Sequence, residues 1–173
     1  HDNQWIFYAK GGTYSPLLSR FDLVLNWQNN GAEVKEFSAA IYGSWSKQIT
    51  NTQYFGRSGL TYPRRTQNEF APSLLPHGCG FDVQGSCIFK EGSKEREWIT
   101  LSLIFSSRIF NALLRVGLAR TGGLAKTYAE SLILSMPLPE YENSELAELA
   151  EKIIQVRRRV YETDISFVGY KKF

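Results

Sequence analysis

Residues 97–118 read EWITLSLIFSSRIFNALLRVGL. The stretch contains no proline and no glycine before Gly117, and its apolar side chains occupy almost every angle around a helix. A helix that is apolar on most sides is buried against a sheet or against other helices. The stretch therefore predicts one long buried helix over residues 97–118. It separates a glycine-rich first part of the chain from a last part that ends in a charged helix.

Short apolar runs alternate with turn residues before this helix. Ten of the 14 glycines lie before Lys94, and apolar runs bounded by glycine or proline are typical of strands joined by turns. The predicted strands are Trp5–Ala9, Phe21–Trp27, Gln53–Phe55, Ser73–Leu75 and Ser86–Phe89. Residues 28–30 and 67–68, rich in asparagine and glutamine, read as loops. We expect the fold class α+β, with a twisted, mainly antiparallel sheet and one buried helix.

The last part of the chain predicts a short strand and a long helix. Leu132–Leu134 reads as the strand, and Met136–Pro139 then stops regular structure because of its prolines. Residues 144–162 predict a spacer-like C-terminal helix with an apolar stripe at three- and four-residue spacing, close to a heptad repeat. The stripe consists of Leu146, Leu149, Ile153, Val156 and Val160. We expect residues 1–139 to form one domain and residues 140–173 a helical extension.

Composition limits the class of protein. The chain has 173 residues and a net charge of +3. It has no apolar run near the ~18–20 residues of a membrane span and no signal-peptide pattern at its start, so we expect a cytoplasmic protein that does not bind a membrane. Cys79 and Cys87 are then expected to be reduced thiols. The start at His1 reads either as a piece cut from a longer protein or as a chain that carries a tag remnant.

Residues 54–67, YFGRSGLTYPRRTQ, are the most informative segment for function. A guanidinium fork matches phosphate oxygens or the O6/N7 edge of guanine, and a glutamine amide matches adenine. Threonine hydroxyls donate to phosphate, and a tyrosine ring stacks on a base. The candidate DNA contacts here are Arg57, Thr61, Tyr62, Arg64, Arg65, Thr66 and Gln67. An exposed hairpin with merely solvated arginines is the open alternative.

Residues 55–66 resemble a segment of large bacterial N6-adenine DNA methyltransferases. These include phage-defence enzymes of the BREX type and fused restriction–methylation enzymes, in which the segment reads aromatic–x–x–x–Gly–Leu–Thr–Trp–Pro–Arg–Arg–Thr. Tyr62 stands here in place of the tryptophan. The segments 75–81 and 103–110 are similar to later blocks of the same domains. The Met136–Pro139 break before a charged helix resembles the end of a recognition domain in type I specificity subunits.

This resemblance implies a target-recognition domain that reads double-stranded DNA beside a catalytic domain of the same parent chain. The catalytic domain would bind S-adenosylmethionine and methylate a flipped adenine. The chain itself has no Pro-Pro dipeptide and no Phe-x-Gly-x-Gly loop, which such catalysis requires. We therefore expect no catalytic residue and no cofactor in this chain. Lys10, Arg65 and Lys126 are expected to contact phosphates, and Arg57, Arg64, Thr61 and Gln67 to contribute readout.

Three other hypotheses can be compared with the sequence: a zinc site, a hydrolase and a protein–protein interaction module. His77, Cys79 and Cys87 supply only three zinc ligands at unfavourable spacing, whereas a structural site takes four. The shortage of histidines and the lack of a Gly-x-Ser-x-Gly elbow argue against a hydrolase. The main rival is a protein–protein interaction module that docks a partner helix on the apolar stripe of residues 146–160.

Overall fold

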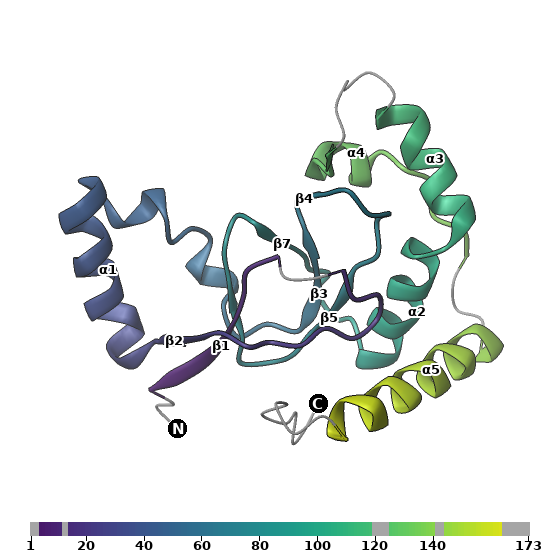
Figure 1. Cartoon of the computed structure of the whole chain (residues 1–173), viewed down its shortest axis with the longest axis horizontal. Helices are drawn as coiled ribbons and strands as arrows, with labels where there is room; N and C mark the ends of the chain where they lie inside the picture. The colour runs from purple at the N-terminus through teal and green to yellow at the C-terminus, as the bar shows by residue number, and fades with distance from the viewer. Residues whose placement is uncertain (1–3, 12–13, 119–124, 141–143, 164–173) are drawn as a thin grey trace.

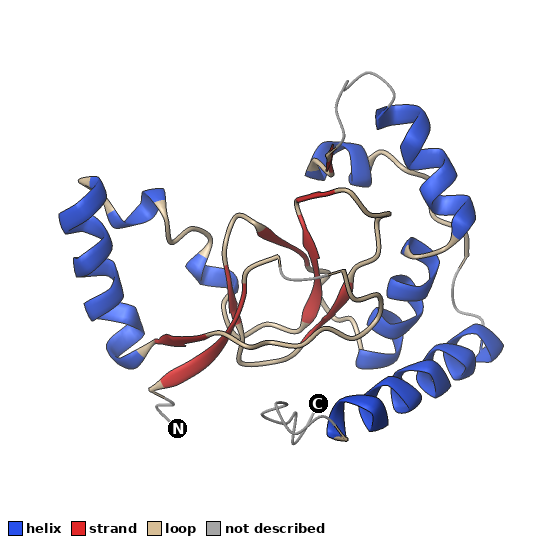
Figure 2. Cartoon of the chain, viewed as in Figure 1, coloured by secondary structure: helices blue, strands red, loops and turns tan. Residues whose placement is uncertain are grey.

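A computed structural model describes residues 4–11, 14–118, 125–140 and 144–163. The protein has a mixed α+β fold in which helices surround small sheets (Figure 2), as the sequence predicts. The elements in chain order are β1 (Trp5–Ala9), β2 (Val24–Asn26), α1 (Gln28–Tyr42), the 3-10 helices η1 (Trp45–Lys47) and η2 (Thr52–Tyr54), β3 (Gly59–Pro63), β4 (Arg65–Thr66), β5 (Ser73–Leu75), β6 (Gly80–Phe81), β7 (Gly85–Ile88), α2 (Glu95–Phe105), α3 (Arg108–Leu118), β8 (Lys126–Thr127), α4 (Glu130–Leu134) and α5 (Ser144–Glu162).

The described strands form three small sheets instead of one. The order β5-β3-β7 is antiparallel throughout, and β4 pairs antiparallel with β8. In the order β2-β1-β6, β1 is antiparallel to β2 and parallel to β6. Pairing is therefore mainly antiparallel, and β3 is the central strand of the sheet that carries the segment singled out above.

One continuous hydrophobic core joins the β5-β3-β7 sheet to helices α2, α3 and α5. Buried side chains that meet there include Tyr62 from β3, Trp98 from α2, Leu114 from α3 and Ile154 from α5. Figure 1 shows these helices together on one side of the sheets, with α1 on the other side. The residues just outside the ends of β3 remain at the surface, and the candidate site lies there.

The predicted helix over residues 97–118 is two helices. α2 and α3 meet at a bend of 62°, with Ser106 and Ser107 between them. The Ser106 hydroxyl donates to the carbonyl of Ser102 (2.7 Å), and the Ser107 hydroxyl accepts the backbone N–H of Phe110 (3.2 Å). Serine hydroxyls satisfy backbone groups where a helix ends and another begins. The apolar pattern thus remains unbroken while the axis turns.

Two more local predictions are wrong, and a third is confirmed in part. Gln53–Phe55 lies in and just after the 3-10 helix η2 instead of a strand, and Leu132–Leu134 belongs to helix α4. The loop predicted over residues 28–30 agrees with the non-helical backbone of Asn29 and Asn30, although α1 is counted from Gln28. In α4 the side chain of Ile133 is buried while that of Leu134 is 81% exposed. Such one-turn segments are too short for apolar periodicity to identify.

α5 has the predicted bounds but packs with a different face. Ala147, Ala150 and Ile154 are buried against the core. Near its end, Tyr161 donates through its hydroxyl to the carbonyl of Leu18 (3.1 Å), and the Arg157 guanidinium donates to the carbonyl of Pro16. Residues 144–163 therefore share the core of the preceding residues. The division of the chain at residue 139 stays a prediction.

No single helix among the described ranges is long and apolar enough to cross a membrane, although the bent pair α2–α3 passes that test by joint length and composition.

Candidate nucleic-acid interface

The middle of the 54–67 segment is core. β3 lies between β5 and β7, and Leu60, Thr61 and Tyr62 expose 0%, 6% and 2% of their surface. The Tyr62 ring packs edge-on against Phe70 with 5.0 Å between ring centroids, and burial raises its pKa to about 12. The structure therefore corrects the expectation for Thr61 and Tyr62, because side chains inside a central strand do not reach DNA.

The arginines of the segment lie at the two ends of β3. Arg57 precedes the strand and is exposed, with its guanidinium 5.0 Å from the centre of the Tyr54 ring and 4.0 Å from the carboxylate of Glu91. Arg64 and Arg65 follow the strand and are also exposed. Within the described residues, neither of these two takes part in an ion pair. Both residues therefore lie exposed just beyond the end of the buried strand β3.

Three chain segments converge beside Arg64. Its backbone N–H donates to the carbonyl of Gln84 (3.0 Å), and the N–H of Asp82 donates to the carbonyl of Ala9 (3.1 Å). The Asp82 carboxylate in turn accepts the N–H groups of Gln84 (2.7 Å) and Gly85 (3.0 Å). These bonds fix the turn between β6 and β7 against the end of β1. The segments that carry exposed Lys10 and Arg64 are thereby both held against this turn.

Gln84 is a candidate contact that the sequence reasoning missed. Its side chain is exposed in the β6–β7 turn, beside Arg64, and a glutamine amide suits an adenine edge. The Asp82-x-x-Gly85 pattern signals a turn in the sequence. Only the tertiary fold shows that this turn lies beside the arginines, because Arg64 and Gln84 are 20 positions apart in the chain.

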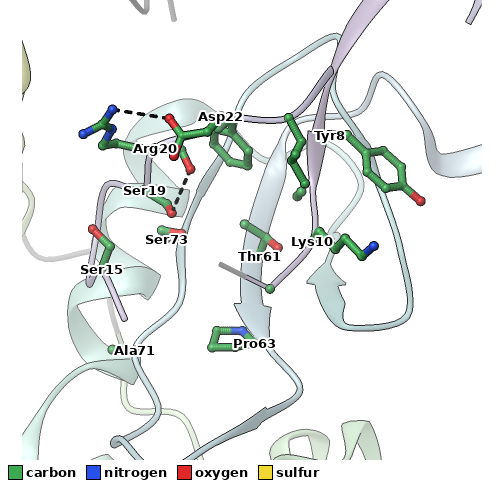
Figure 3. A pocket seen from close by; sticks show the side chains of 14 residues that line it. Tyr8, Lys10, Ser15, Ser19, Arg20, Asp22, Thr61, Pro63, Ala71 and Ser73 are labelled. Atoms are coloured by element: carbon green, nitrogen blue, oxygen red, sulfur yellow. Dashed lines mark hydrogen bonds and ion pairs between the residues drawn. The ribbon is translucent and has the colours of Figure 1, made fainter. Parts of the chain in front are cut away.

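A pocket of about 220 Å³ lies beneath Lys10. Figure 3 shows Lys10 and Tyr8 on one side of it and Ser15, Ser19 and Arg20 on the other. Arg20 pairs with Asp22 at 3.4 Å, so this pair adds little net charge. Burial and then the charge of Asp82 raise the pKa of Tyr8. Lys10 is the lysine among the residues that line this pocket, and its side chain is exposed.

β4 and β8 carry the remaining predicted contacts. Gln67 is exposed, and Thr66 is half-buried with its hydroxyl accepting the N–H of Asn68 (3.1 Å). The ammonium of Lys126 lies 2.9 Å from the carboxylate of Glu69, and the Arg115 guanidinium lies 3.1 Å from the same carboxylate. Burial acts to raise the pKa of Glu69, but hydrogen bonds from Lys126 and Arg115 outweigh it and the pKa is lowered. Lys126 is therefore compensated within the chain, unlike Arg64 and Arg65.

The two cysteines are thiols held in or near the second, smaller core cluster of the protein. Burial raises the pKa of Cys79 and of Cys87 to about 12. Protonated thiols are poor nucleophiles and poor metal ligands. Among the described residues there is no group of three or more histidine, cysteine or acidic side chains placed to hold a metal ion.

We expect Gly85→Ala to disturb this surface through its backbone. A Cβ at residue 85 would lie 2.6 Å from the carbonyl oxygen of Ala9 and 2.7 Å from the N–H nitrogen of Gly11, so β1 and the β6–β7 turn must separate. Such overpacking costs about 1–3 kcal/mol, measured as the loss in free energy of urea unfolding. Gly92→Ala is the control: its φ of +72° is strained but nothing lies within 4 Å. A loss of unfolding free energy in the Gly92 variant as large as in the Gly85 variant would contradict this expectation.

No family model matches the chain. The chain is similar to the adenine-specific methyltransferase BrxX of Escherichia coli O9:H4 (strain HS), with 22% identity over 160 residues. The matched region covers 91% of this chain and 12% of that protein. The chain thus spans about an eighth of its relative's length, and the similarity relates it to one part of an adenine-specific methyltransferase.

Proposed function

We propose that this chain is a sequence-reading module for double-stranded DNA, the target-recognition domain of an adenine-specific DNA methyltransferase or restriction–modification enzyme. The observation that carries the proposal is the pair Arg64 and Arg65, exposed at the end of a buried strand and outside any ion pair among the described residues. Lys10 and Gln84 belong to the segments that pack beside this pair. Cations with interleaved amides on one rigid surface are the groups that bind phosphates and read base edges.

The proposed roles follow from exposure and pairing. Lys10 and Arg65 contact phosphates, whereas Arg64, Gln67 and Gln84 read base edges. Arg57 extends the surface at the other end of β3 and is stacked on Tyr54. Lys126 contributes only where a phosphate displaces Glu69. Thr66, half-buried and already accepting a hydrogen bond, supports the β4 turn and donates to phosphate.

Methyl transfer is proposed to belong to a larger protein of which this chain is a part. A catalytic domain of that protein would bind S-adenosylmethionine, in keeping with the similarity to an adenine-specific methyltransferase many times longer. This chain would position that domain on its site. A role in bacterial defence in the cytoplasm is part of the same proposal.

The test is fluorescence anisotropy of the purified chain with a labelled duplex over a salt series. Affinity that falls log-linearly with salt, with a slope of about −0.9 per phosphate contact, is expected from counterion release. Selection from a random duplex pool then identifies the preferred site. If no duplex binds at low salt, and none binds when the chain is joined to its catalytic domain, the proposal is overturned.

We expect Glu69→Gln to strengthen DNA binding. The substitution removes the carboxylate that holds Lys126 and Arg115 at 2.9 and 3.1 Å, and it frees two cations for phosphates. Two more phosphate contacts correspond to a salt slope steeper by about 2 and a gain of several-fold at low salt. Glu36→Gln is the matched control, since Glu36 is exposed on α1. Equal gains from both variants would show that net charge alone is responsible.

Docking of a partner helix on α5 is a second candidate function, favoured by one observation. Leu149, Val156 and Val160 are 53%, 61% and 60% exposed, although α5 is held firmly by its opposite face. Acidic Glu145 and Glu148 precede basic Lys152 and Arg159 along the stripe, which favours an antiparallel helix of the same charge order. We expect Val156→Glu to abolish such pairing without altering DNA affinity, which sedimentation velocity and anisotropy would show.

A further inference from the structure

The turn at Leu17 has an unfavourable backbone. Leu17 has a φ of +68°, in a region that residues other than glycine rarely adopt. The N–H of Leu18 donates to the carbonyl of Pro16 at 2.8 Å, which closes a γ-turn around Leu17. Both leucines are buried, and the carbonyl of Leu17 accepts the N–H of Leu74 from β5 at 3.0 Å. A strained backbone of this kind persists only where its surroundings hold it.

Helix α5 supplies two side chains that hold this turn. The Arg157 guanidinium donates to the carbonyl of Pro16 and, at 3.4 Å, to that of Leu18. It also donates to the hydroxyl of Ser15 at 3.3 Å. The Tyr161 hydroxyl, one turn further along the helix, donates to the carbonyl of Leu18 at 3.1 Å. Hydrogen bonds from a charged donor are the stronger kind, so Arg157 is the main support of the turn.

Arg157 directs its charge to the turn instead of to a carboxylate. Its side chain is half-buried, and among the described residues it forms no ion pair. Arg159 lies two positions further along the same helix and is exposed. Two positions correspond to a rotation of about 200° around a helix. The two arginines therefore carry equal charge on opposite faces of α5, and it is Arg157 that faces the turn.

The turn that Arg157 holds leads to β1, the strand that precedes Lys10. Side chains of the segment 15–20 form the wall of the pocket opposite Lys10 (Figure 3). Further along the chain, the carbonyl of Leu23 accepts the N–H of Tyr8 at 2.9 Å, and β2 pairs with β1. A displaced turn would therefore displace the end of β1 as well.

We infer that Arg157 is a positioning residue for duplex binding, which holds the Pro16–Leu18 turn and through it sets the position of Lys10. The inference rests on the proposed function, in which Lys10 contacts a phosphate. Arg157 itself touches no DNA in this arrangement, because its guanidinium faces the turn. Its loss should therefore have the effect that the loss of Lys10 has.

The experiment compares Arg157→Met with Arg159→Met, since both variants remove one positive charge from α5 and keep an apolar stem. Anisotropy with a labelled duplex over a salt series gives the affinity and the salt slope. We expect Arg157→Met to bind about tenfold more weakly near about 50 mM salt, with a slope lower by about 1, the effect of one lost phosphate contact. Arg159→Met should leave both nearly unchanged. Equal losses in the two variants would show that charge alone is responsible and would overturn the inference.

A double-mutant cycle with Lys10→Ala separates positioning from a general loss of structure. If Arg157 acts through Lys10, Arg157→Met should weaken binding no further once Lys10 is absent. Additive losses overturn the inference, because residues that act independently add. Arg157→Lys should recover part of the affinity, since an ammonium group also donates to carbonyls.

Tyr161→Phe tests the same turn where Arg157→Met does not fold. It removes the hydroxyl that donates to the carbonyl of Leu18 and keeps the ring. We expect a loss of about threefold, the scale of one neutral hydrogen bond, and no loss in the Lys10→Ala background. A loss that persists in that background overturns the inference and leaves the DNA reader intact. Failure of the unmodified chain to bind any duplex overturns both.

Discussion

Replacing Arg64 and Arg65 together by alanine is expected to weaken duplex binding by about 100-fold, the effect of losing one base-reading fork and one phosphate contact. Both side chains are exposed and, within the described residues, form no ion pair. Their loss therefore breaks no ion pair among these residues, and the thermal unfolding midpoint should change little. Anisotropy over a salt series measures the affinity, and we expect the salt slope to fall by between about 1 and 2.

The double variant has a matched control on the opposite part of the molecule. Lys152→Ala with Arg159→Ala removes the same net charge from exposed positions of α5, away from β3 and β4 in Figure 1. If this control lost as much affinity as the Arg64 and Arg65 variant, binding would reflect overall charge instead of a built surface. Unchanged affinity of the Arg64 and Arg65 variant would rule out the proposed interface.

The single variants separate positioning from readout. Arg65→Ala should weaken all duplexes by a similar factor, because a phosphate contact carries no sequence information. Arg64→Ala should instead relax the preference at one position of the selected site, at a cost of about 1–3 kcal/mol for the cognate base. Selection from a random pool with each variant distinguishes the two outcomes.

The sequence predicted those elements whose own residues show a clear apolar pattern or clear boundaries. β1 (Trp5–Ala9) and β5 (Ser73–Leu75) have the predicted bounds, as does α5 (Ser144–Glu162). Each is a run bounded by turn residues or carries a clear helical spacing. Segments of one turn, such as α4, were misassigned because a few residues cannot establish a period. The bend at Ser106–Ser107 was not predicted because serine hydroxyls can end a helix without any glycine or proline in the sequence.

The face of α5 shows what apolar spacing alone does not reveal. The large side chains of the stripe suggested a surface for a partner helix, whereas toward its own core the helix turns Ala147, Ala150 and Ile154. Small side chains let two helices approach closely, so a face rich in alanine packs well against α2 despite its low hydrophobicity. The exposed Leu149 and Val156 could not be distinguished from core residues by their spacing.

Within the candidate site, only the residues at the ends of β3 could be predicted from the sequence. The sequence identified Arg64 and Arg65, but Thr61 and Tyr62 beside them are buried because β3 has a neighbour on each side. Neighbour strands are contributed by distant residues, so the segment itself carries no sign of this. The compensation of Lys126 by Glu69 spans 57 positions, and it became visible only with the fold.

Asn111→Ala is expected to lower the free energy of unfolding by about 3 kcal/mol, the largest stability effect among these predictions. Asn111 exposes 2% of its surface. Its side-chain oxygen accepts the N–H of Phe70 (2.7 Å), and its amide donates to the carbonyls of Phe70 (2.9 Å), Phe105 (3.2 Å) and Ser107 (3.1 Å). Alanine removes the acceptor of the buried Phe70 N–H and the donor to the buried Phe70 carbonyl, and each group left unpaired costs about 1–3 kcal/mol unless water enters.

Urea unfolding measures this loss, and Asn68→Ala is the matched control. Asn68 is exposed, and its side chain makes a 3.4 Å contact with the hydroxyl of Thr66, so a change within about 0.5 kcal/mol is expected. Because Asn111 ties the α2–α3 bend to the loop that follows Gln67, its loss should also loosen that loop and weaken duplex binding. Retained stability in Asn111→Ala would mean that the bend is fixed by apolar packing of Phe70, Phe105 and Phe110 alone.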